Sequence, residues 1–216
     1  MIKENILRVK ESITAVCAKI KADPEKISLV CVTKGRSVEQ ILEAVNSGLR
    51  CLGENRVKEA REKYRQVPEA EWQMVGHLQL NKVKDALRIF SLIHSVDSIE
   101  LAQEINKQAL KINKVQDILL EVKTSPEVTK FGFKPEVLLD AFEEISSLDN
   151  LRVKGLMTIA PAVNNTEEAR QYFTKLRQLR DRLNPGWLLS MGMTDDFEVA
   201  IEEGADIIRL GRAIFG

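Results

Sequence analysis

The 216-residue sequence contains only three cysteines and two histidines. Cys17, Cys31 and Cys51 are odd in number and lack C-x-x-C spacing, which argues against a disulfide framework or a zinc knuckle. We therefore expect reduced thiols that behave as small buried residues. His77 and His94 show neither H-x-E nor H-E-x-x-H spacing, and no G-x-S-x-G elbow is present. These absences disfavour a metalloenzyme and a serine hydrolase.

The sequence also lacks an excess of charge and a long apolar run. Lys plus Arg number 32, as do Asp plus Glu, so nothing indicates a general affinity for nucleic acid or membranes. No apolar run approaches about 18 residues, and the polar N-terminus MIKENILRVKES has no signal-peptide core. We expect a cytoplasmic protein with a small-molecule partner. The lack of an obvious exposed apolar stripe favours a monomer.

Apolar runs alternate with helical patterns along the chain. Eight runs have the composition of strands buried on both faces, and they occupy residues 27–33, 51–54, 72–78, 92–96, 117–123, 151–159, 187–192 and 206–211. Most are followed by apolar residues three and four apart, which predicts a helix. Eight repeats predict a single (β/α)₈ TIM-type barrel of class α/β, with residues 1–216 as one domain. A doubly wound open sheet is the alternative.

The first segment is expected to complete this barrel. Apolar residues between Ile2 and Ile20 fall on one helical face, and Asp23-Pro24 ends the pattern. Only RAIFG follows the last strand, so no helix of its own remains to cover it. An extra N-terminal helix can fill that gap.

The first predicted strand ends on Lys34. Function in a β/α barrel gathers at the carboxyl ends of the strands, and polar residues or glycines follow nearly every strand here. Apolar surroundings would partly desolvate the Lys34 ammonium and lower its pKa. A neutral amine can form a Schiff base with an aldehyde.

The segments after strands seven and eight suit a phosphate. The candidates for binding it are Ser190, Gly192, Met193, Thr194, Gly211 and Arg212. Loops at these two positions form the usual phosphate site of the fold, where hydroxyls, backbone amides and glycines can approach the anion. Asp195 and Asp196 can cap the following helix, but must then point away from a phosphate. An aldehyde and a phosphate on one molecule describe pyridoxal 5′-phosphate and some sugar phosphates.

Several stretches resemble the pyridoxal-phosphate homeostasis protein family, which is similar to the barrel domain of alanine racemase. They are VCVTKGRSVEQILEAVNSG, LGENRVKEA, GHLQLNKVK, IHSVDS, KFGF, GLMTIAP and LSMGMTDDFEVAIEEGADIIRLGRAIFG. The resemblance covers essentially the whole chain. It implies a barrel that binds pyridoxal 5′-phosphate through Lys34.

The resemblance also implies roles for other residues. The phosphate would lie among Ser190, Thr194, Gly211 and Arg212. Arg209 would approach the pyridine nitrogen and keep it unprotonated, which weakens the cofactor as an electron sink. Asn55 and Met157 would line the pocket, with His77 near it.

The family has no established catalytic reaction. It is linked to the balance of vitamin B6 and amino-acid pools, with pyridoxal-phosphate-dependent apoenzymes as possible transient partners. The sequence departs from the common pattern at Gly35, where a proline is frequent, so a more mobile loop is expected.

Two enzymatic alternatives remain at this point. A racemase needs acid and base groups on both faces of the cofactor, but Tyr64 and Tyr172 both fall within or near helical patterns. Lys82 or His77 could serve as a base, but Lys82 is better explained as a solvated residue at a helix start, and a structural histidine explains His77 equally well. A Schiff-base aldolase would also use a lysine and a phosphate site, but its lysine more often lies on a central strand.

Overall fold

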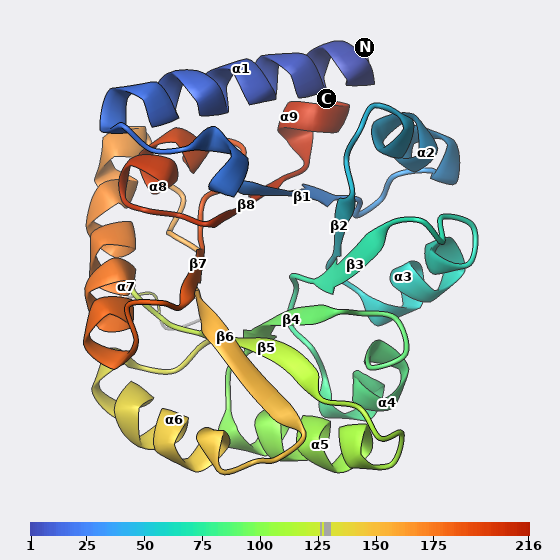
Figure 1. The fold of residues 1–216 in the computed structure, drawn as a ribbon, viewed down its shortest axis with the longest axis vertical. Coiled ribbons are helices and arrows are strands. Elements are labelled where there is room, and N and C mark those ends of the chain that lie inside the picture. Colours follow the sequence, from blue (N-terminus) through green and yellow to red (C-terminus); the bar gives the residue numbers. More distant parts are fainter. Residues whose placement is uncertain (126, 128–130) are drawn as a thin grey trace.

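Eight parallel strands form a closed barrel in the computed structural model, which describes residues 1–125, 127 and 131–216 (Figure 1). The strands are β1 (Ser28–Val32), β2 (Cys51–Glu54), β3 (Glu71–Met74), β4 (Leu92–Val96), β5 (Gln116–Glu121), β6 (Leu151–Met157), β7 (Leu188–Ser190) and β8 (Ile207–Leu210). Strand β1 pairs with β2 on one side and with β8 on the other. This closure confirms the predicted (β/α)₈ class and excludes the open sheet.

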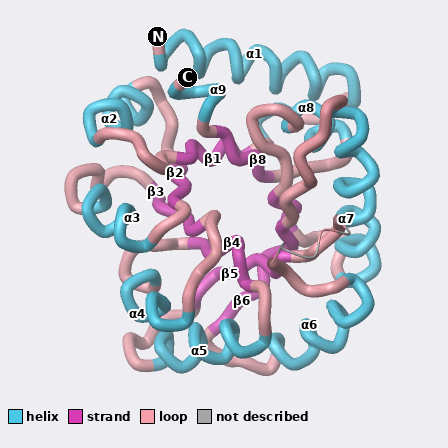
Figure 2. The backbone as a smooth tube through the Cα atoms, turned by 180° about the vertical axis from the view of Figure 1, so that it is seen from behind, coloured by secondary structure: helices cyan, strands magenta, loops and turns pink. Residues whose placement is uncertain are grey.

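Helices surround the strands as an outer ring (Figure 2). The α-helices are α1 (Ile2–Ile20), α2 (Val38–Asn46), α3 (Val57–Tyr64), α4 (Val83–Ala86), α5 (Ile99–Leu110), α6 (Leu138–Ser146), α7 (Arg170–Leu183), α8 (Phe197–Glu202) and α9 (Arg212–Phe215). Short 3₁₀ turns are η1 (Pro24–Lys26), η2 (Leu80–Lys82), η3 (Pro135–Val137) and η4 (Thr166–Ala169).

The N-terminal helix α1 packs beside α8 and α9 at the end of the chain (Figure 1). Its buried face carries the predicted apolar residues, from Ile2 to Cys17. The side-chain amide of Asn5 donates to the backbone oxygen of Ile214 at 2.9 Å, which ties the two ends together. The predicted role of α1 in completing the ring is confirmed. The expectation that no helix follows β8 is wrong, because RAIF forms the short α9.

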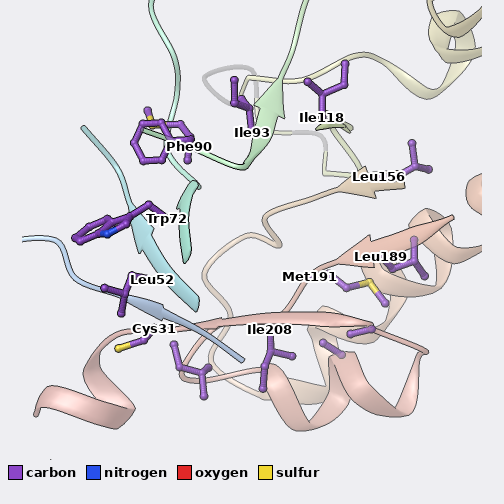
Figure 3. Close-up of a cluster of buried hydrophobic side chains, with 14 of the residues drawn as sticks. Cys31, Leu52, Trp72, Phe90, Ile93, Ile118, Leu156, Leu189, Met191 and Ile208 are labelled. Carbon is purple, nitrogen blue, oxygen red and sulfur yellow. The ribbon is translucent and has the colours of Figure 1, made fainter. Parts of the chain in front are cut away.

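Strand alternation divides the apolar side chains into two layers. An inner cluster within the barrel contains Val30, Val75, Leu92, Leu119, Met157 and Ile207. The neighbouring strand residues point outward to the helices, among them Cys31, Leu52, Trp72, Ile93, Ile118, Leu156, Leu189 and Ile208 (Figure 3). Because successive strand residues face opposite sides of a sheet, the register of the inner layer also fixes which polar residues face the barrel axis.

The three thiols are free. Cys17 and Cys31 are buried, as expected, whereas Cys51 is half-buried. Burial raises the pKa of Cys31 to about 12 and that of Cys51 to about 11, with Glu71 adding to the shift at Cys51. Among the described residues, no helix combines the length and hydropathy that crossing a membrane requires.

Candidate functional site

Lys34 occupies the corner of a tight turn that leaves the end of β1. The amide of Arg36 donates to the carbonyl of Thr33 at 3.0 Å, and Gly35 has φ +68°, a conformation that favours glycine. Lys34 itself is exposed, and its amine has no partner among the described residues. The expected desolvation of the ammonium is therefore wrong, because the turn projects the residue beyond the buried strand.

Contacts on both sides hold this turn. Ser37 begins α2 with a capping box that includes Gln40. The Arg36 guanidinium donates to the terminal oxygen of Gly216 at 2.7 Å and lies 5.3 Å from the ring centre of Phe215. These contacts hold the turn on both sides, and the more mobile loop expected from the missing proline stays a prediction.

A cavity of about 470 Å³ opens beside Lys34, and the predicted residues Asn55 and His77 also line it. The lining also includes Lys82, which the racemase alternative named as a candidate base, and residues that sequence reasoning did not assign, namely Arg56, Val57, Lys58, Met74, Gly76 and Gln79. Among the lining residues that the structure describes, four side chains are Lys or Arg and none is Asp or Glu. The cavity therefore favours an anionic or electron-rich ligand.

His77 is held at the rim by two neighbours. Its Nδ1 lies 3.0 Å from a carboxylate oxygen of Asp97, and its ring stacks on Phe131 with centroids 3.9 Å apart. Both contacts fix the ring orientation. They agree with the structural interpretation of His77, a residue that also lines the cavity.

A buried hydrogen-bond chain crosses the barrel below the mouth. Arg209 Nη1 donates to Ser190 Oγ at 2.6 Å, so the hydroxyl is free to donate to His94 Nδ1, 2.9 Å away. His94 Nε2 lies 2.8 Å from Gln73 Oε1, which can only accept, so Nε2 carries the ring proton. Burial, and then the charge of Arg209, lower the pKa of His94 well below its usual value. The chain thus contains a neutral imidazole.

Glu121 and Arg209 share this interior. Burial, and then the charge of Asp97, raise the pKa of Glu121 from 4.5 to about 7, with Arg209 opposing the shift. Burial lowers the pKa of Arg209 from 12.5 to about 10, while Glu121 and Asp196 oppose that change. Arg209 also donates to the carbonyl of Thr158 at 2.9 Å. Because the pKa of Arg209 is still well above 7, the buried guanidinium remains a cation at neutral pH.

The predicted phosphate segments adjoin one another after β7 and β8. The hydroxyl oxygen of Thr194 accepts from the amide of Ala213 at 3.3 Å, and Arg212 pairs with Asp195 at 2.5 Å. Asp196 turns inward and accepts from the amide of Met193 at 2.6 Å. Asp196 therefore points into its own loop, while Asp195 forms an ion pair with the exposed Arg212.

Packing and buried hydrogen bonds explain several of the predicted residues without a ligand. Gly192 has φ +93°, and a Cβ there would lie 2.6 Å from the Cβ of Ala200, so glycine is required whether or not a phosphate binds. Ser190 is fully buried in the hydrogen-bond chain rather than placed on the rim. Met157 belongs to the inner apolar cluster, and Gly211 packs beside Val32 of β1.

The predicted residues thus form two groups at the carboxyl ends of the strands. Lys34, Asn55 and His77 share the cavity, and the rest follow or end strands β6 to β8. Sequence reasoning missed the interior roles of Gln73, His94, Thr158 and Glu121. Spacing could have revealed two of them, because His94 and Glu121 lie two residues beyond the inward Leu92 and Leu119 of the same strands.

The family model for the N-terminal domain of alanine racemase matches residues 1–216. A pyridoxal phosphate homeostasis protein of Aquifex aeolicus (strain VF5) is 46% identical over 220 residues, covering 99% of this chain and 96% of the relative. A protein of the same name from Escherichia coli (strain K12) is 34% identical over 224 residues, covering 100% of this chain and 96% of the relative.

Solved structures show the same fold. PipY of Synechococcus elongatus PCC7942, determined with PLP bound, is 32% identical with a TM-score of 0.86, and the match covers 100% of both chains. Alanine racemase of Clostridium difficile 630 is 16% identical with a TM-score of 0.80, covering 100% of this chain and 59% of the racemase. At that identity the racemase supports the barrel architecture alone.

Proposed function

This chain belongs to the pyridoxal phosphate homeostasis proteins of the alanine racemase N-terminal domain family, and we propose that it binds pyridoxal 5′-phosphate as a Schiff base on Lys34 without catalysing a reaction of its own. In this proposal the barrel acts as one cytoplasmic cofactor-binding domain that takes part in vitamin B6 and amino-acid homeostasis. The observation that carries it is the exposed, partner-free amine of Lys34 on a tightly held turn at the mouth of the barrel.

The chemistry of the surrounding groups fits this cofactor. The Lys34 amine would add to an aldehyde carbon, and one water leaves as the C=N bond forms. Arg212, the hydroxyl of Thr194 and the backbone near Gly211 supply donors of the kind a phosphate requires. Arg209 supplies a buried cation that would oppose protonation of the pyridine nitrogen.

The same arrangement supports a binding role over a racemase. Tyr64 lies on the outer helix α3, and Tyr172 is half-buried against the core from α7. Neither belongs to the mouth where an acid–base pair would act on a substrate. Lys82 and His77 do line the cavity with Lys34, so exchange of the α-hydrogen of amino acids with solvent is the assay that would reveal the enzymatic alternative.

Borohydride trapping tests the proposed linkage. The protein is incubated with pyridoxal 5′-phosphate, its visible spectrum is recorded, and reduction is followed by peptide mapping. We expect a yellow protein with the pyridoxyl group on the peptide that contains Lys34. Lys34→Ala should lose both the colour and the label while keeping the circular dichroism of the folded barrel, because residue 34 is exposed.

Lys107→Ala is the matched control, since it removes a lysine from the exposed surface of α5. It should retain the label in full. A label on a different lysine, or a colourless wild-type protein after incubation, contradicts the proposal.

A further inference from the structure

A second lysine lies close to the Lys34 turn, but it is buried. Lys63 of α3 has only 8% of its surface exposed, and its Nζ donates to Glu54 at 2.5 Å and to the carbonyl of Thr33 at 2.8 Å. A buried ammonium is costly unless charge and hydrogen bonds compensate it. Here both are present, and one acceptor is the first residue of the turn.

Glu54 joins the turn to the end of β2. The residue is fully buried between β2 and α3, and its Oε1 also accepts from the hydroxyl of Thr33 at 2.8 Å. Its Oε2 accepts from the amide of Asn55 at 3.1 Å. Both carboxylate oxygens are therefore satisfied, and one side chain fixes residues on either side of the cavity opening.

Glu59 reaches the turn from the same helix, one helical turn before Lys63. Its carboxylate accepts from the amide of Gly35 at 3.2 Å and lies 3.5 Å from Lys63 Nζ. The residues before and after Lys34 are thus both held by α3, through Thr33 and Gly35. The side chain of Lys34, which lies between them, has no hydrogen-bond or ion-pair partner in the part of the chain that the structure describes.

We propose that Glu54, Glu59 and Lys63 are positioning residues that hold the Lys34 turn, so that its amine stays aligned for covalent capture of an aldehyde ligand. The inference rests on the proposed function in naming that ligand. The three side chains act through the backbone of Thr33 and Gly35 and do not need to touch the ligand. Their effect should fall on the covalent step rather than on recognition of the ring or the phosphate.

Glu59 offers the cleanest perturbation. Lys63→Met would leave the buried Glu54 carboxylate without its cation and endanger folding, whereas Glu59 is partly exposed. Glu59→Ala removes the acceptor for the Gly35 amide. Glu59→Gln restores an acceptor of the same size while still lacking the charge that faces Lys63. Glu62→Ala is the control on the exposed side of the same helix.

Two ligands separate positioning from general damage. Titration with pyridoxal 5′-phosphate, followed by the imine absorbance, measures covalent capture, and pyridoxamine 5′-phosphate reports recognition without an aldehyde. We expect Glu59→Ala to weaken capture about fivefold, the equivalent of one hydrogen bond, and to leave pyridoxamine 5′-phosphate binding unchanged. Glu59→Gln and Glu62→Ala should both capture pyridoxal 5′-phosphate with the wild-type affinity. Equal loss for both ligands, or no loss for either, overturns the proposal.

Amide hydrogen exchange at Gly35 provides a readout that does not depend on any ligand. Exchange should be faster in Glu59→Ala than in wild type and Glu59→Gln, because the amide loses its acceptor. Equal rates in all three proteins would refute the positioning role even if no ligand bound. A wild-type protein that never forms the imine would refute the proposed function instead, so the two failures are distinguishable.

Discussion

Replacing Glu121 by glutamine should make the protein more stable at neutral and alkaline pH, but not in acid. Glu121 is 7% exposed, and burial raises its pKa from 4.5 to about 7. The folded state therefore holds a proton that the unfolded chain releases between these two values. Stability from this group is complete below pH 4.5 and is lost as the pH rises through 7. Glutamine resembles the protonated acid and does not titrate.

The magnitude follows from the two pKa values. Each unit of pKa difference corresponds to about 1.4 kcal/mol, so a rise from 4.5 to about 7 corresponds to about 3 kcal/mol. Arg209 opposes the shift and Asp97 reinforces it, and both influences are already included in the value. We expect Glu121→Gln to match the wild type near pH 4.5 and to exceed it by up to about 3 kcal/mol above pH 7.

Urea unfolding of cofactor-free protein between pH 4.5 and 8.5 measures this difference, since a bound ligand would add its own linkage. The quantity to plot is the free energy of unfolding of the variant minus that of the wild type. Glu62→Gln, at an exposed carboxyl of α3, controls for the change in net charge. A difference that stays constant over the whole pH range would refute the reasoning.

Two further substitutions test packing and phosphate recognition. Gly155→Ala should lower the free energy of unfolding by about 3 kcal/mol or more in urea titrations. The reason is that a Cβ at this position would lie 2.0 Å from the carbonyl oxygen of Leu188 and must force β6 and β7 apart. A loss below about 1 kcal/mol would show that the two strands adjust freely. Arg212→Ala should weaken pyridoxamine 5′-phosphate several-fold in a fluorescence titration while leaving phosphate-free pyridoxamine unaffected, and equal affinity of variant and wild type would remove Arg212 from the phosphate site.

Local pattern was sufficient to predict the barrel because each strand and helix carries its own periodicity. The strand predicted over 92–96 coincides with β4, and the one over 72–78 was too long, since β3 ends at Met74. Beyond it, Gly76 passes so close to the backbone of Asn55 that a Cβ would lie 2.6 Å from the Asn55 oxygen. Such a contact joins the segments that follow β2 and β3, and it leaves no periodic pattern in the sequence of either.

The candidate site was predictable in position but only partly in arrangement. Placement of Lys34 and Arg209 at strand ends follows from the fold, and their assignment to a cofactor stays a prediction. The burial of Lys63 could not be predicted, because VKEAREKY is rich in charge and is typical of a solvated helix face. Only the packing of α3 against β2 brings Lys63 to the carboxylate of Glu54.

The hydrogen bond from Arg36 to the oxygen of Gly216 has a practical consequence for handling the protein. Any sequence fused after Gly216 would begin beside the guanidinium of Arg36, which lies two residues after Lys34 in the sequence, and would compete for this guanidinium that steadies the turn. A dye coupled at the carboxyl terminus, by the same geometry, would sense events at the barrel mouth.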